Sequence, residues 1–294
     1  VFCPSDEDEL LAGLPVLLDS RRPTYVRYYA GPAAVQHAPF DLGRAETLQG
    51  ASGPTLRAPI PPEVMAGLGP RLGESMTVGN EGCGVVVAAG ESPEAQALLG
   101  RSIAFVGAAS YAQYRSVPAM MCLALADGTT PQQGAGAFVN PLTVLGFVET
   151  MRMDGHTALV HTAAASNLGQ MLVRVCQEDS IPLVNIVRSP AQVEILRKLG
   201  AEFVVDSSSA NFRDELTDAL ATTGATLGFD AIGGGPLTTT ILSCMEAAIG
   251  RTRTEYSRYG SDVHKQVYIY GALDRSPTPL TRDFGFSWGV AGWL

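Results

Sequence analysis

The sequence predicts an α/β protein with a doubly wound parallel sheet, and three observations support that class. Strand-like and helix-like patterns alternate from Thr157 to Gly271. A turn of small residues, 163–169, joins the first strand of this series to its first helix. A preceding region, 54–127, is richer in strand patterns bounded by Gly and Pro. Because βα units of this length form parallel sheets with right-handed crossovers, we expect helices on both faces of the sheet.

The composition narrows the classes of function. The chain has 294 residues, of which 46% are hydrophobic, enough to bury the cores of two domains. Only 17% of the residues are charged and the formal net charge is −9. Nucleic acid is therefore not an expected partner, because its binding proteins usually present a basic face. An anionic cofactor can still bind locally, at a helix N-terminus beside an Arg.

The cysteines and the apolar runs bear on location. The five cysteines are scattered, odd in number and without a CxxC pair, which is typical of free thiols in a reducing compartment. No apolar run reaches the roughly 18 residues that a membrane span needs, and the acidic start VFCPSDEDEL lacks the layout of a leader peptide. We therefore expect a cytoplasmic protein without a membrane partner. The chain starts without Met and stops within the apolar FGFSWGVAGWL, which reads as a piece of something longer.

The first half of the chain is expected to contain few regular elements. Ser5 is a plausible N-cap for a helix with acids in its first turn, and a short strand over 23–29 precedes a linker. In the β-rich region we expect strands over 84–89 and 101–106 and a weaker one over 112–117. A helix is expected from Pro131 to Met151.

The second half follows the βα rhythm closely. Each strand pattern is four to six residues long, and each of the first four is followed by a helical pattern. Strands are expected over 157–162, 183–187, 202–205, 226–230 and 267–270, and helices over 168–178, 190–199, 210–221 and 236–248.

The first βα turn, VHTAAASNLGQM, has the layout of a phosphate cradle. Such a turn needs small residues so that backbone N–H groups can approach a phosphate, and the helix dipole then favours the anion. Residues 163–169 are small apart from Leu168, Ser166 offers a hydroxyl, and Asn167 tolerates a left-handed backbone. Only Gly169 remains of the usual glycines. A tight turn in a core without ligand is the open alternative.

The end of the second predicted strand bears on the choice of cofactor. An acid about 20 residues past the turn would hold the ribose of NAD. Here Arg188 and Ser189 stand at that strand end instead. This pair suits a 2′-phosphate, so NADP(H) is favoured over NAD(H). A solvated Arg at a strand end is the alternative.

Two later strand ends add to the same edge. FDAIGGG places Asp230 and three glycines, 233–235, after the fourth strand, and Gly271 follows the fifth. Glycine there permits close approach to a nucleotide. A plain turn before a helix explains FDAIGGG equally well.

Six stretches in the observed order resemble the medium-chain dehydrogenase/reductase superfamily, and within it the zinc-independent, quinone-oxidoreductase-like branch. They are VGNEGCGVVVAAG, NPLTVLGFVETM, HTALVHTAAASNLGQM, LRKLGAEFVVDSS, TGATLGFDAIGGG and YSRYGSDVHKQVYIYGAL, within residues 54–294. The resemblance implies a β-rich, GroES-like catalytic domain and a Rossmann cofactor domain. It also implies hydride transfer between NAD(P)H and a carbonyl, activated alkene or quinone, with the cofactor in the cleft between the domains.

The residues and the resemblance together predict a set of cofactor contacts. Thr143 in NPLT matches a family threonine near the nicotinamide, Arg188 matches the adenosine-phosphate selector, and Gly271 matches the wall of the nicotinamide pocket. The predicted cofactor-binding residues are Thr143, Ala164, Ser166, Asn167, Leu168, Arg188, Ser189, Ile232, Gly233 and Gly271.

Zinc is not expected, and no catalytic residue is assigned. Zinc-dependent relatives place a His in a GHE motif, whereas this chain has Asn80 in GNEG and lacks the four-cysteine lobe. Tyr256, Tyr259 and His264 are candidate proton donors by residue type only, and a solvated polar connection is the favoured interpretation of their segment. His161 is interpreted as a satisfied strand residue.

Residues 1–50 do not resemble this superfamily. CPSDEDELLAGLPVLLDSRRPTYVRYY followed by FDLGRAETLQ instead resembles transketolase, at the end of its pyrimidine-binding domain. The thiamine-binding acid and the diphosphate–metal motif belong to parts of transketolase that this chain lacks. A thiamine-dependent transferase fragment is therefore the least favoured hypothesis.

The chain is thus expected to be a mosaic of three parts. These are a transketolase-like segment with its linker (1–52), a partial GroES-like domain (53–140) and a Rossmann domain truncated at its C-terminus (141–294). The leading hypothesis is an NADP(H)-dependent, zinc-independent oxidoreductase acting on a small-molecule substrate, with turnover impaired by the missing ends. The alternative is a nucleotide-binding remnant or sensor without catalysis. Analogy with the family implies a homodimer or homotetramer.

Overall fold

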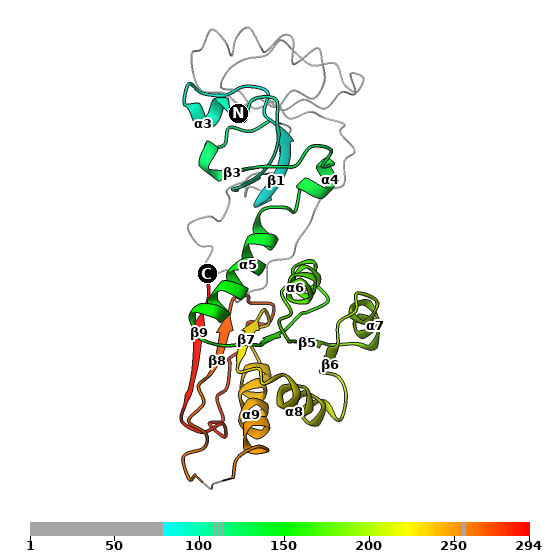
Figure 1. Cartoon of the computed structure of the whole chain (residues 1–294), viewed down its shortest axis with the longest axis vertical. Helices are drawn as coiled ribbons and strands as arrows, with labels where there is room; N and C mark the ends of the chain where they lie inside the picture. Colours follow the sequence, from blue (N-terminus) through cyan, green and yellow to red (C-terminus); the bar gives the residue numbers. More distant parts are fainter. Residues whose placement is uncertain (1–78, 109, 111, 113, 255–256) are drawn as a thin grey trace. The chain divides into compact units, whose positions relative to one another are not determined.

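The computed structural model describes residues 79–108, 110, 112, 114–254 and 257–294. The chain divides into two compact units, Val1–Val139 and Asn140–Leu294 (Figure 1). The helix expected after Ser5 and the strand expected over 23–29 lie outside the described residues, as does the expected linker.

The described part of the first unit holds a three-stranded antiparallel sheet in the order β1-β2-β3. Its elements are β1 (Glu81–Val85), α3 (Pro93–Gln96), β2 (Ser102–Val106), the 3-10 turn η2 (Ala119–Met121), β3 (Cys122–Ala124) and α4 (Pro131–Gly134). Ala104 of β2 packs with Cys83 and Leu125 on one face. Its neighbours Ile103 and Phe105 are buried on the other face, as the alternation of side chains along a strand requires.

Two strand predictions in this unit were wrong. The first strand begins earlier than the predicted range 84–89, at Glu81. In the predicted range 112–117, the described residues form no strand. Arg115 Nη1 instead donates hydrogen bonds to Gly107 O at 2.6 Å and Ser110 Oγ at 2.9 Å. These side-chain bonds hold the segment in a loop conformation. The residue pattern that predicted a strand contains no sign of them.

The helix predicted from Pro131 to Met151 is two helices. The first, α4, carries a capping box between Thr130 and Gln133 and ends at Gly134. The second, α5 (Val139–Met153), begins where the Val139 N–H donates to Glu81 Oε2 at 2.7 Å. The break therefore depends on a carboxylate contributed by a strand 58 residues away in the sequence, which satisfies a free helix N–H.

The second unit holds a six-stranded parallel sheet in the order β6-β5-β4-β7-β8-β9. Its strands are β4 (Leu159–His161), β5 (Leu183–Val187), β6 (Phe203–Asp206), β7 (Leu227–Asp230), β8 (Lys265–Ile269) and β9 (Trp288–Gly292). Its further helices are α6 (Asn167–Glu178), α7 (Pro190–Lys198), α8 (Phe212–Thr223) and α9 (Leu237–Gly250). Numbered along the sheet's own strands, this is the 3-2-1-4-5-6 order of a dinucleotide-binding fold.

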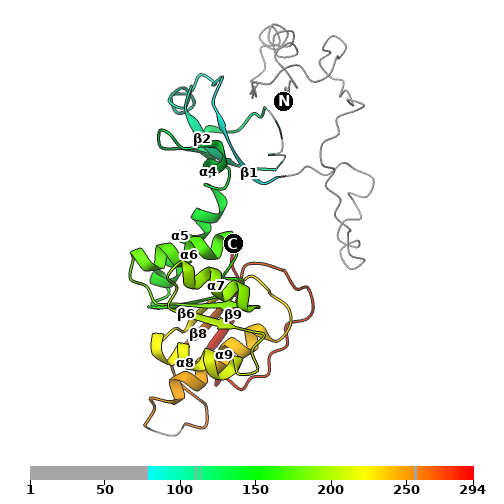
Figure 2. The ribbon, with the colours of Figure 1, turned by 90° about the vertical axis from the view of Figure 1, so that its right-hand side faces the viewer.

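Helices cover both faces of the sheet, as predicted. Figure 2 shows α5, α6 and α7 on one face and α8 and α9 on the other. Phe147, Leu172 and Leu196 of the first group are buried with Leu159 of β4. Leu216 and Ile241 of the second group belong to a separate buried cluster. The sheet therefore separates two hydrophobic cores, and the predicted fold class is confirmed.

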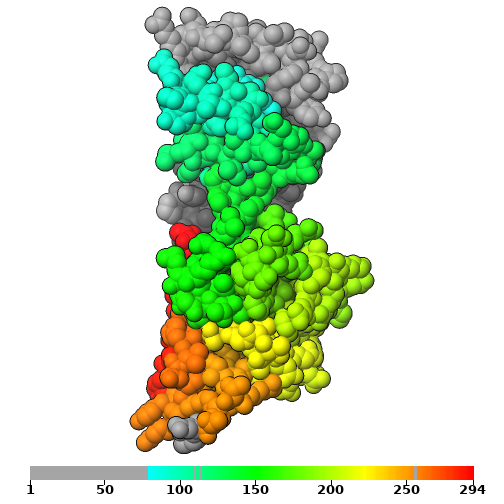
Figure 3. Space-filling model, viewed as in Figure 1, coloured from blue at the N-terminus to red at the C-terminus, as the bar shows by residue number. Residues whose placement is uncertain are grey.

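The sixth strand, β9, was not predicted. It pairs in parallel with β8 along its whole length, and Trp293 just after it donates a hydrogen bond from Nε1 to Thr150 Oγ1 of α5 at 3.0 Å. The red C-terminal residues lie beside α5 at the surface in Figure 3. A Cβ at Gly289 would come within 2.3 Å of Gln266 Oε1. A larger residue at this position would require the Gln266 side chain to move. Glycine in a short run argues against a strand, which explains why β9 was not predicted.

Candidate functional site

The predicted cofactor residues of the second unit gather along one edge of its sheet, where the parallel strands end. Ser166 and its neighbours follow β4, Arg188 and Ser189 follow β5, Ile232 and Gly233 follow β7, and Gly271 comes two residues after β8 ends. The strand order reverses between β5 and β7, on either side of β4. Ligands of doubly wound sheets bind beyond the carboxyl ends at such a reversal.

The turn after β4 has free backbone donors. Ser166 is the N-cap of α6, and its hydroxyl accepts a hydrogen bond from Gly169 N at 3.1 Å. Within the described residues, the N–H groups of Asn167 and Leu168 have no assigned acceptor. They begin a helix of 12 residues. Two free N–H groups at a helix N-terminus form a site suited to an anion.

The backbone of this turn explains which residues must be small. Ala163 has a left-handed backbone, φ 51°, a conformation that glycine usually supplies. A Cβ on Gly169 would lie 2.1 Å from the carbonyl oxygen of Ala164, which is fully buried. Gly169 therefore allows α6 to pack closely against the strand end, which is the role of the third glycine in a dinucleotide-binding turn.

The end of β5 carries an exposed positive charge. The Arg188 side chain is exposed, and in the described residues its guanidinium has no ion-pair partner. Its backbone N–H donates to Gln192 Oε1 at 3.0 Å, which holds the strand end against α7. Ser189 is the N-cap of α7, but its hydroxyl makes no capping bond. Both polar groups are thus available to a ligand.

Asp230 ties the ends of two neighbouring strands together. Its carboxylate is fully buried and accepts hydrogen bonds from Thr162 Oγ1 at 2.8 Å, Thr238 Oγ1 at 2.7 Å and Ile232 N at 2.9 Å. The Thr162 hydroxyl in turn accepts from Ala231 N at 2.8 Å. A buried carboxylate with this many donors is held rigidly. Asp230 therefore fixes the positions of the strand ends at this edge. The sequence pointed to Asp230 but gave no sign of its two threonine partners.

Gly233 and Gly271 lie against each other's loops. A Cβ on Gly233, whose φ is 81°, would meet Gly271 O at 2.8 Å, and a Cβ on Gly271 would meet Ala231 O at 2.5 Å. The loop after β8 also donates from Asp274 N to Ile232 O at 2.9 Å. Close packing of the two loops therefore explains why both positions are glycine, without any ligand. The backbone of both residues still lines the edge.

Thr143 lies on α5, one helical turn before Phe147. The Phe147 ring stacks on Phe229 of β7 with centroids 3.9 Å apart and contacts the ring of Tyr270 at 4.9 Å. Tyr270 directly follows β8 at the carboxyl edge. Since α5 runs antiparallel to the strand that follows it, its N-terminal half, including Thr143, extends toward that edge.

A buried histidine–tyrosine pair at the same edge was not predicted. His161, the last residue of β4, has no exposed surface, and its Nε2 is 2.7 Å from the Tyr270 hydroxyl oxygen. Its Nδ1 is buried without a partner among the described residues. Burial lowers the pKa of His161 to about 3, so the ring is neutral near pH 7. The interpretation of His161 as a strand residue is right, but its hydrogen bonding is only half complete.

The candidates named by residue type lie elsewhere. His264 immediately precedes β8, at the amino edge of the sheet, and is exposed. Tyr259 lies earlier in the same connection, is 61% exposed, and its ring contacts Phe286. Tyr256 is outside the described residues. The structure therefore does not bring Tyr259 or His264 to the carboxyl edge.

The part of the chain that the structure describes holds neither a metal-binding cluster nor a membrane-spanning helix. No group of three or more His, Cys, Asp or Glu side chains there could hold a metal ion. Asn80 of the GNEG motif is exposed just before β1. Cys83, Cys122, Cys176 and Cys244 are free thiols, whereas Cys3 is outside the described residues. None of the described helices is long and apolar enough to cross a bilayer.

Comparison with known proteins points to reductases. No protein-family model matches the chain. It is 26% identical over 162 residues to the synaptic vesicle membrane protein VAT-1 homolog of Rattus norvegicus, covering 54% of this chain and 39% of that protein. It is 25% identical over 171 residues to prostaglandin reductase-3 of Bos taurus, covering 56% and 43%. It is also 25% identical over 158 residues to a probable quinone oxidoreductase of Schizosaccharomyces pombe, covering 53% and 47%.

Solved structures agree on the fold. A protein of Mesorhizobium loti named "putative NADPH:quinone reductase" matches with a TM-score of 0.60 and 28% identity, covering 74% of this chain and 60% of that one. The CurK enoyl reductase matches with a TM-score of 0.59 and 15% identity, covering 79% and 66%. The chain spans less than half the length of the curated relatives that it matches.

The comparisons carry the reductase part of the resemblance but not the transketolase part. None of the relatives named above is a transketolase, and residues 1–50 lie outside the described part of the chain. The transketolase resemblance therefore stays a prediction.

Proposed function

We propose that the chain belongs to the medium-chain dehydrogenase/reductase superfamily and is an NADP(H)-dependent oxidoreductase that transfers hydride to a quinone, enone or carbonyl substrate. The observation that carries the proposal is the pair of free N–H groups of Asn167 and Leu168, at the reversal of strand order, with Arg188 at the next strand end. Relatives named as NADPH:quinone, prostaglandin and enoyl reductases support it.

The residues at the edge fit a dinucleotide. The N-terminus of α6 would hold the diphosphate through its free amides, and the missing Cβ of Gly169 keeps the helix close to the strand. Arg188 and the Ser189 hydroxyl would hold the 2′-phosphate, since a guanidinium pairs with phosphate in a bidentate manner. A bound nicotinamide supplies the hydride chemistry, and the protein supplies orientation and a dry site. Thr143, Ile232, Gly233 and Gly271 are proposed to line the nicotinamide end.

Zinc-free chemistry is part of the proposal. Asn80 replaces the histidine of the GHE motif, and its amide is a poor ligand for zinc, which takes Cys, His and carboxylate ligands. No catalytic acid is assigned. The alternative, a nucleotide-binding protein without turnover, is carried by one observation: the cofactor edge lies entirely within the second unit, so binding does not require a substrate site.

A titration of NADPH and NADH, followed by cofactor fluorescence, tests cofactor binding. Arg188→Glu should lower the ratio of NADPH to NADH affinity about tenfold or more, because a charge-assisted bond to phosphate is worth about 1.5–3 kcal/mol. Arg174→Glu is the matched control, since Arg174 is an exposed arginine of α6 beyond its first turn. The absence of saturable binding, or an unchanged ratio in Arg188→Glu, would contradict the assignment.

Turnover separates the enzyme from the nucleotide-binding alternative. Oxidation of NADPH with a panel of small quinones and enones should be detectable but slow. If NADPH binds saturably and no panel member is reduced, the binding protein without catalysis is the better description.

A further inference from the structure

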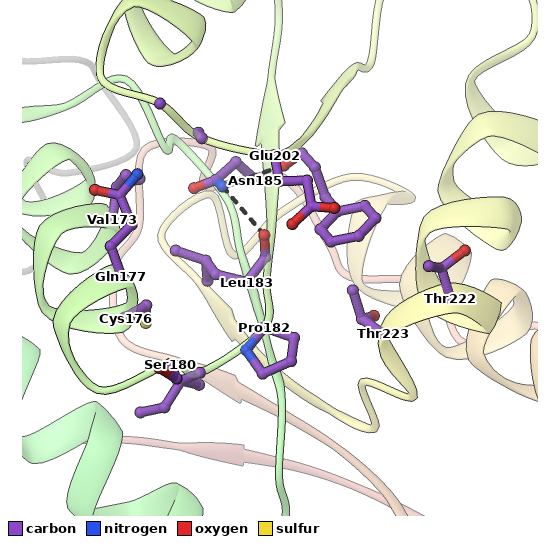
Figure 4. Close-up of a pocket in the computed structure, with 14 residues that line it drawn as sticks. Val173, Cys176, Gln177, Ser180, Pro182, Leu183, Asn185, Glu202, Thr222 and Thr223 are labelled. Atoms are coloured by element: carbon purple, nitrogen blue, oxygen red, sulfur yellow. Dashed lines mark hydrogen bonds between the residues drawn. The ribbon is translucent and has the colours of Figure 1, made fainter.

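A cavity lies at the amino edge of the parallel sheet, opposite the edge proposed to bind the cofactor. It has a volume of about 360 Å³ and lies where β5 and β6 begin, between the C-terminal ends of α6 and α8 (Figure 4). Its apolar wall includes Val173, Ile181 and Phe203. Pockets for small molecules begin near this volume. No residue of the proposed cofactor site lines the cavity.

Asn185 is an unusual residue in the wall of this cavity. It lies in the middle of β5 and is 1% exposed. Its Nδ2 donates to Phe203 O at 3.1 Å and to Leu183 O at 3.3 Å, but its Oδ1 has no partner among the described residues. Figure 4 shows this oxygen turned away from the two bonds, toward α6. A buried acceptor without a donor is destabilising, so a group that supplies a donor there is favoured.

The other polar side chains around the cavity also offer acceptors. The Gln177 amide nitrogen already donates to Leu199 O, and the hydroxyls of Thr222 and Thr223 already donate to carbonyls of α8. Their oxygens keep lone pairs that can accept from a ligand, while the second Gln177 N–H and the Ser180 hydroxyl, which also line the cavity, can donate. Figure 4 shows the Glu202 carboxylate directed into the space beside Asn185. The cavity therefore offers several acceptor oxygens to a ligand that carries N–H donors.

The electrostatic environment favours a positive charge on that ligand. The C-terminal ends of α6 and α8 both border the cavity, and helix C-termini carry partial negative charge. The nearest arginine in the sequence, Arg197, uses its guanidinium on the main-chain oxygens of Ala201 and Glu202. It therefore leaves the Glu202 carboxylate without an ion-pair partner among the described residues.

We propose that this cavity binds a small organic cation, a primary ammonium group on an apolar body. The ammonium group donates to Asn185 Oδ1 and pairs with Glu202, and the body packs on Val173, Ile181 and Phe203. The site is separate from the proposed cofactor edge and does not depend on it.

A bound water is the rival partner for Asn185. His161 is the register neighbour of Asn185 on β4, so their side chains point to the same face, and His161 Nδ1 also lacks a partner. One water between the two would satisfy both atoms without any ligand. It would leave the affinity of the cavity for amines independent of Asn185.

Calorimetry and amide NMR on the full chain test the proposal with 2-phenylethylamine as probe. We expect saturable binding with a dissociation constant on the order of 1 mM, as the size of the probe allows. Amide shifts should be confined to α6, α8 and the starts of β5 and β6. The neutral 2-phenylethanol should bind at least about fivefold more weakly, because it lacks the charge. Equal affinity for the alcohol, or no saturation by the amine, would overturn the proposal.

Two variants locate the contacts. Asn185→Leu removes the acceptor, and Glu202→Gln removes the charge at an exposed position where folding is not at risk. Each should weaken amine binding about tenfold, while the control Glu194→Gln, on the exposed surface of α7, should not. NADPH affinity should stay unchanged in Glu202→Gln, whatever the outcome for the cofactor site. Unchanged amine affinity in Glu202→Gln would overturn the proposal even if Asn185→Leu fails to fold.

Discussion

The carboxyl and amino edges of the parallel sheet present groups of opposite charge. At the carboxyl edge, α6 begins with two free N–H groups and Arg188 is exposed. At the amino edge, α6 and α8 end beside a cavity whose wall includes Asn185 and Glu202. The βα repeat causes this difference, because it places every helix N-terminus at one edge and every C-terminus at the other.

Two buried polar side chains of the sheet also differ in how completely they are hydrogen-bonded. Between β4 and β7 at the carboxyl edge, Asp230 has donors on both oxygens. Between β5 and β6, in the middle of β5, Asn185 keeps one side-chain atom unpaired among the described residues. The fully hydrogen-bonded carboxylate of Asp230 suits the precise placement of a cofactor. The unpaired oxygen of Asn185 is destabilising, so a ligand that donates a hydrogen bond to it would gain affinity.

The largest effect is expected from a substitution in the turn after β4, at the carboxyl edge. Gly169→Ala places a Cβ 2.1 Å from the Ala164 carbonyl oxygen, so α6 must move. We expect a loss of about 3 kcal/mol or more of unfolding free energy, at the upper end for overpacking, with loss of NADPH binding. Urea unfolding measures the first. Gly250→Ala is the control, because no atom lies within 4 Å of its Cβ position, and its stability should hold or rise slightly.

A smaller effect is expected from disrupting the hydrogen bonds of Asp230 at that edge. Asp230→Asn keeps the side-chain volume but turns one acceptor into a donor facing Thr238 or the backbone. We expect a loss of about 1–3 kcal/mol by chemical denaturation. Thr162→Val should be non-additive with it, because the two side chains share a hydrogen bond. The exposed Asp262→Asn should change the free energy of unfolding by less than about 0.5 kcal/mol. If it loses as much stability as Asp230→Asn, the hydrogen bonds of Asp230 have no special stabilising role.

The smallest effect appears only as a dependence on pH. Burial lowers the pKa of His161 to about 3, so between the unfolded value near 6.5 and that value only the unfolded chain gains its proton. Stability is therefore complete above about pH 6.5 and falls by about 1.4 kcal/mol per pH unit below it. The half-buried His156, whose pKa burial also lowers, adds in the same direction.

Removing the titrating ring isolates its share of this slope. His161→Gln, measured by denaturation from pH 7 to pH 5, should reduce the slope by up to about 1.4 kcal/mol per pH unit. An unchanged slope in His161→Gln would show that the ring becomes protonated in the folded state.

The sequence predicted the βα half of the fold well because its signals are local. Each strand of the core order β6-β5-β4-β7-β8 overlaps its predicted range, and helices α6 to α9 follow from their apolar spacing. Two of the elements that were wrong depend on distant partners. The start of α5 depends on Glu81, 58 residues away, and β9 on pairing with β8. The loop around Arg115 depends on side-chain bonds to Gly107 and Ser110, which the alternation of residues does not reveal.

The candidate site divides in the same way. The small residues of the first turn, Arg188 and the glycines after β7 and β8 could be named from the sequence, because each sits at a strand end. The threonines that hold Asp230 and the tyrosine that holds His161 could not, since they come from elements 8 to 109 residues away. The roles of the predicted cofactor residues stay predictions until a cofactor is titrated.

The sequence by itself determined the fold class and the polarity of the sheet. Hydrophobic periodicity sets strands and helices, and the right-handed crossover then decides which residues share an edge. Only the tertiary structure decided which polar atoms are paired. Pairing depends on contacts between strands far apart in the chain, so the satisfied carboxylate of Asp230 and the unpaired oxygen of Asn185 could be told apart only once β4, β5 and β7 lay side by side.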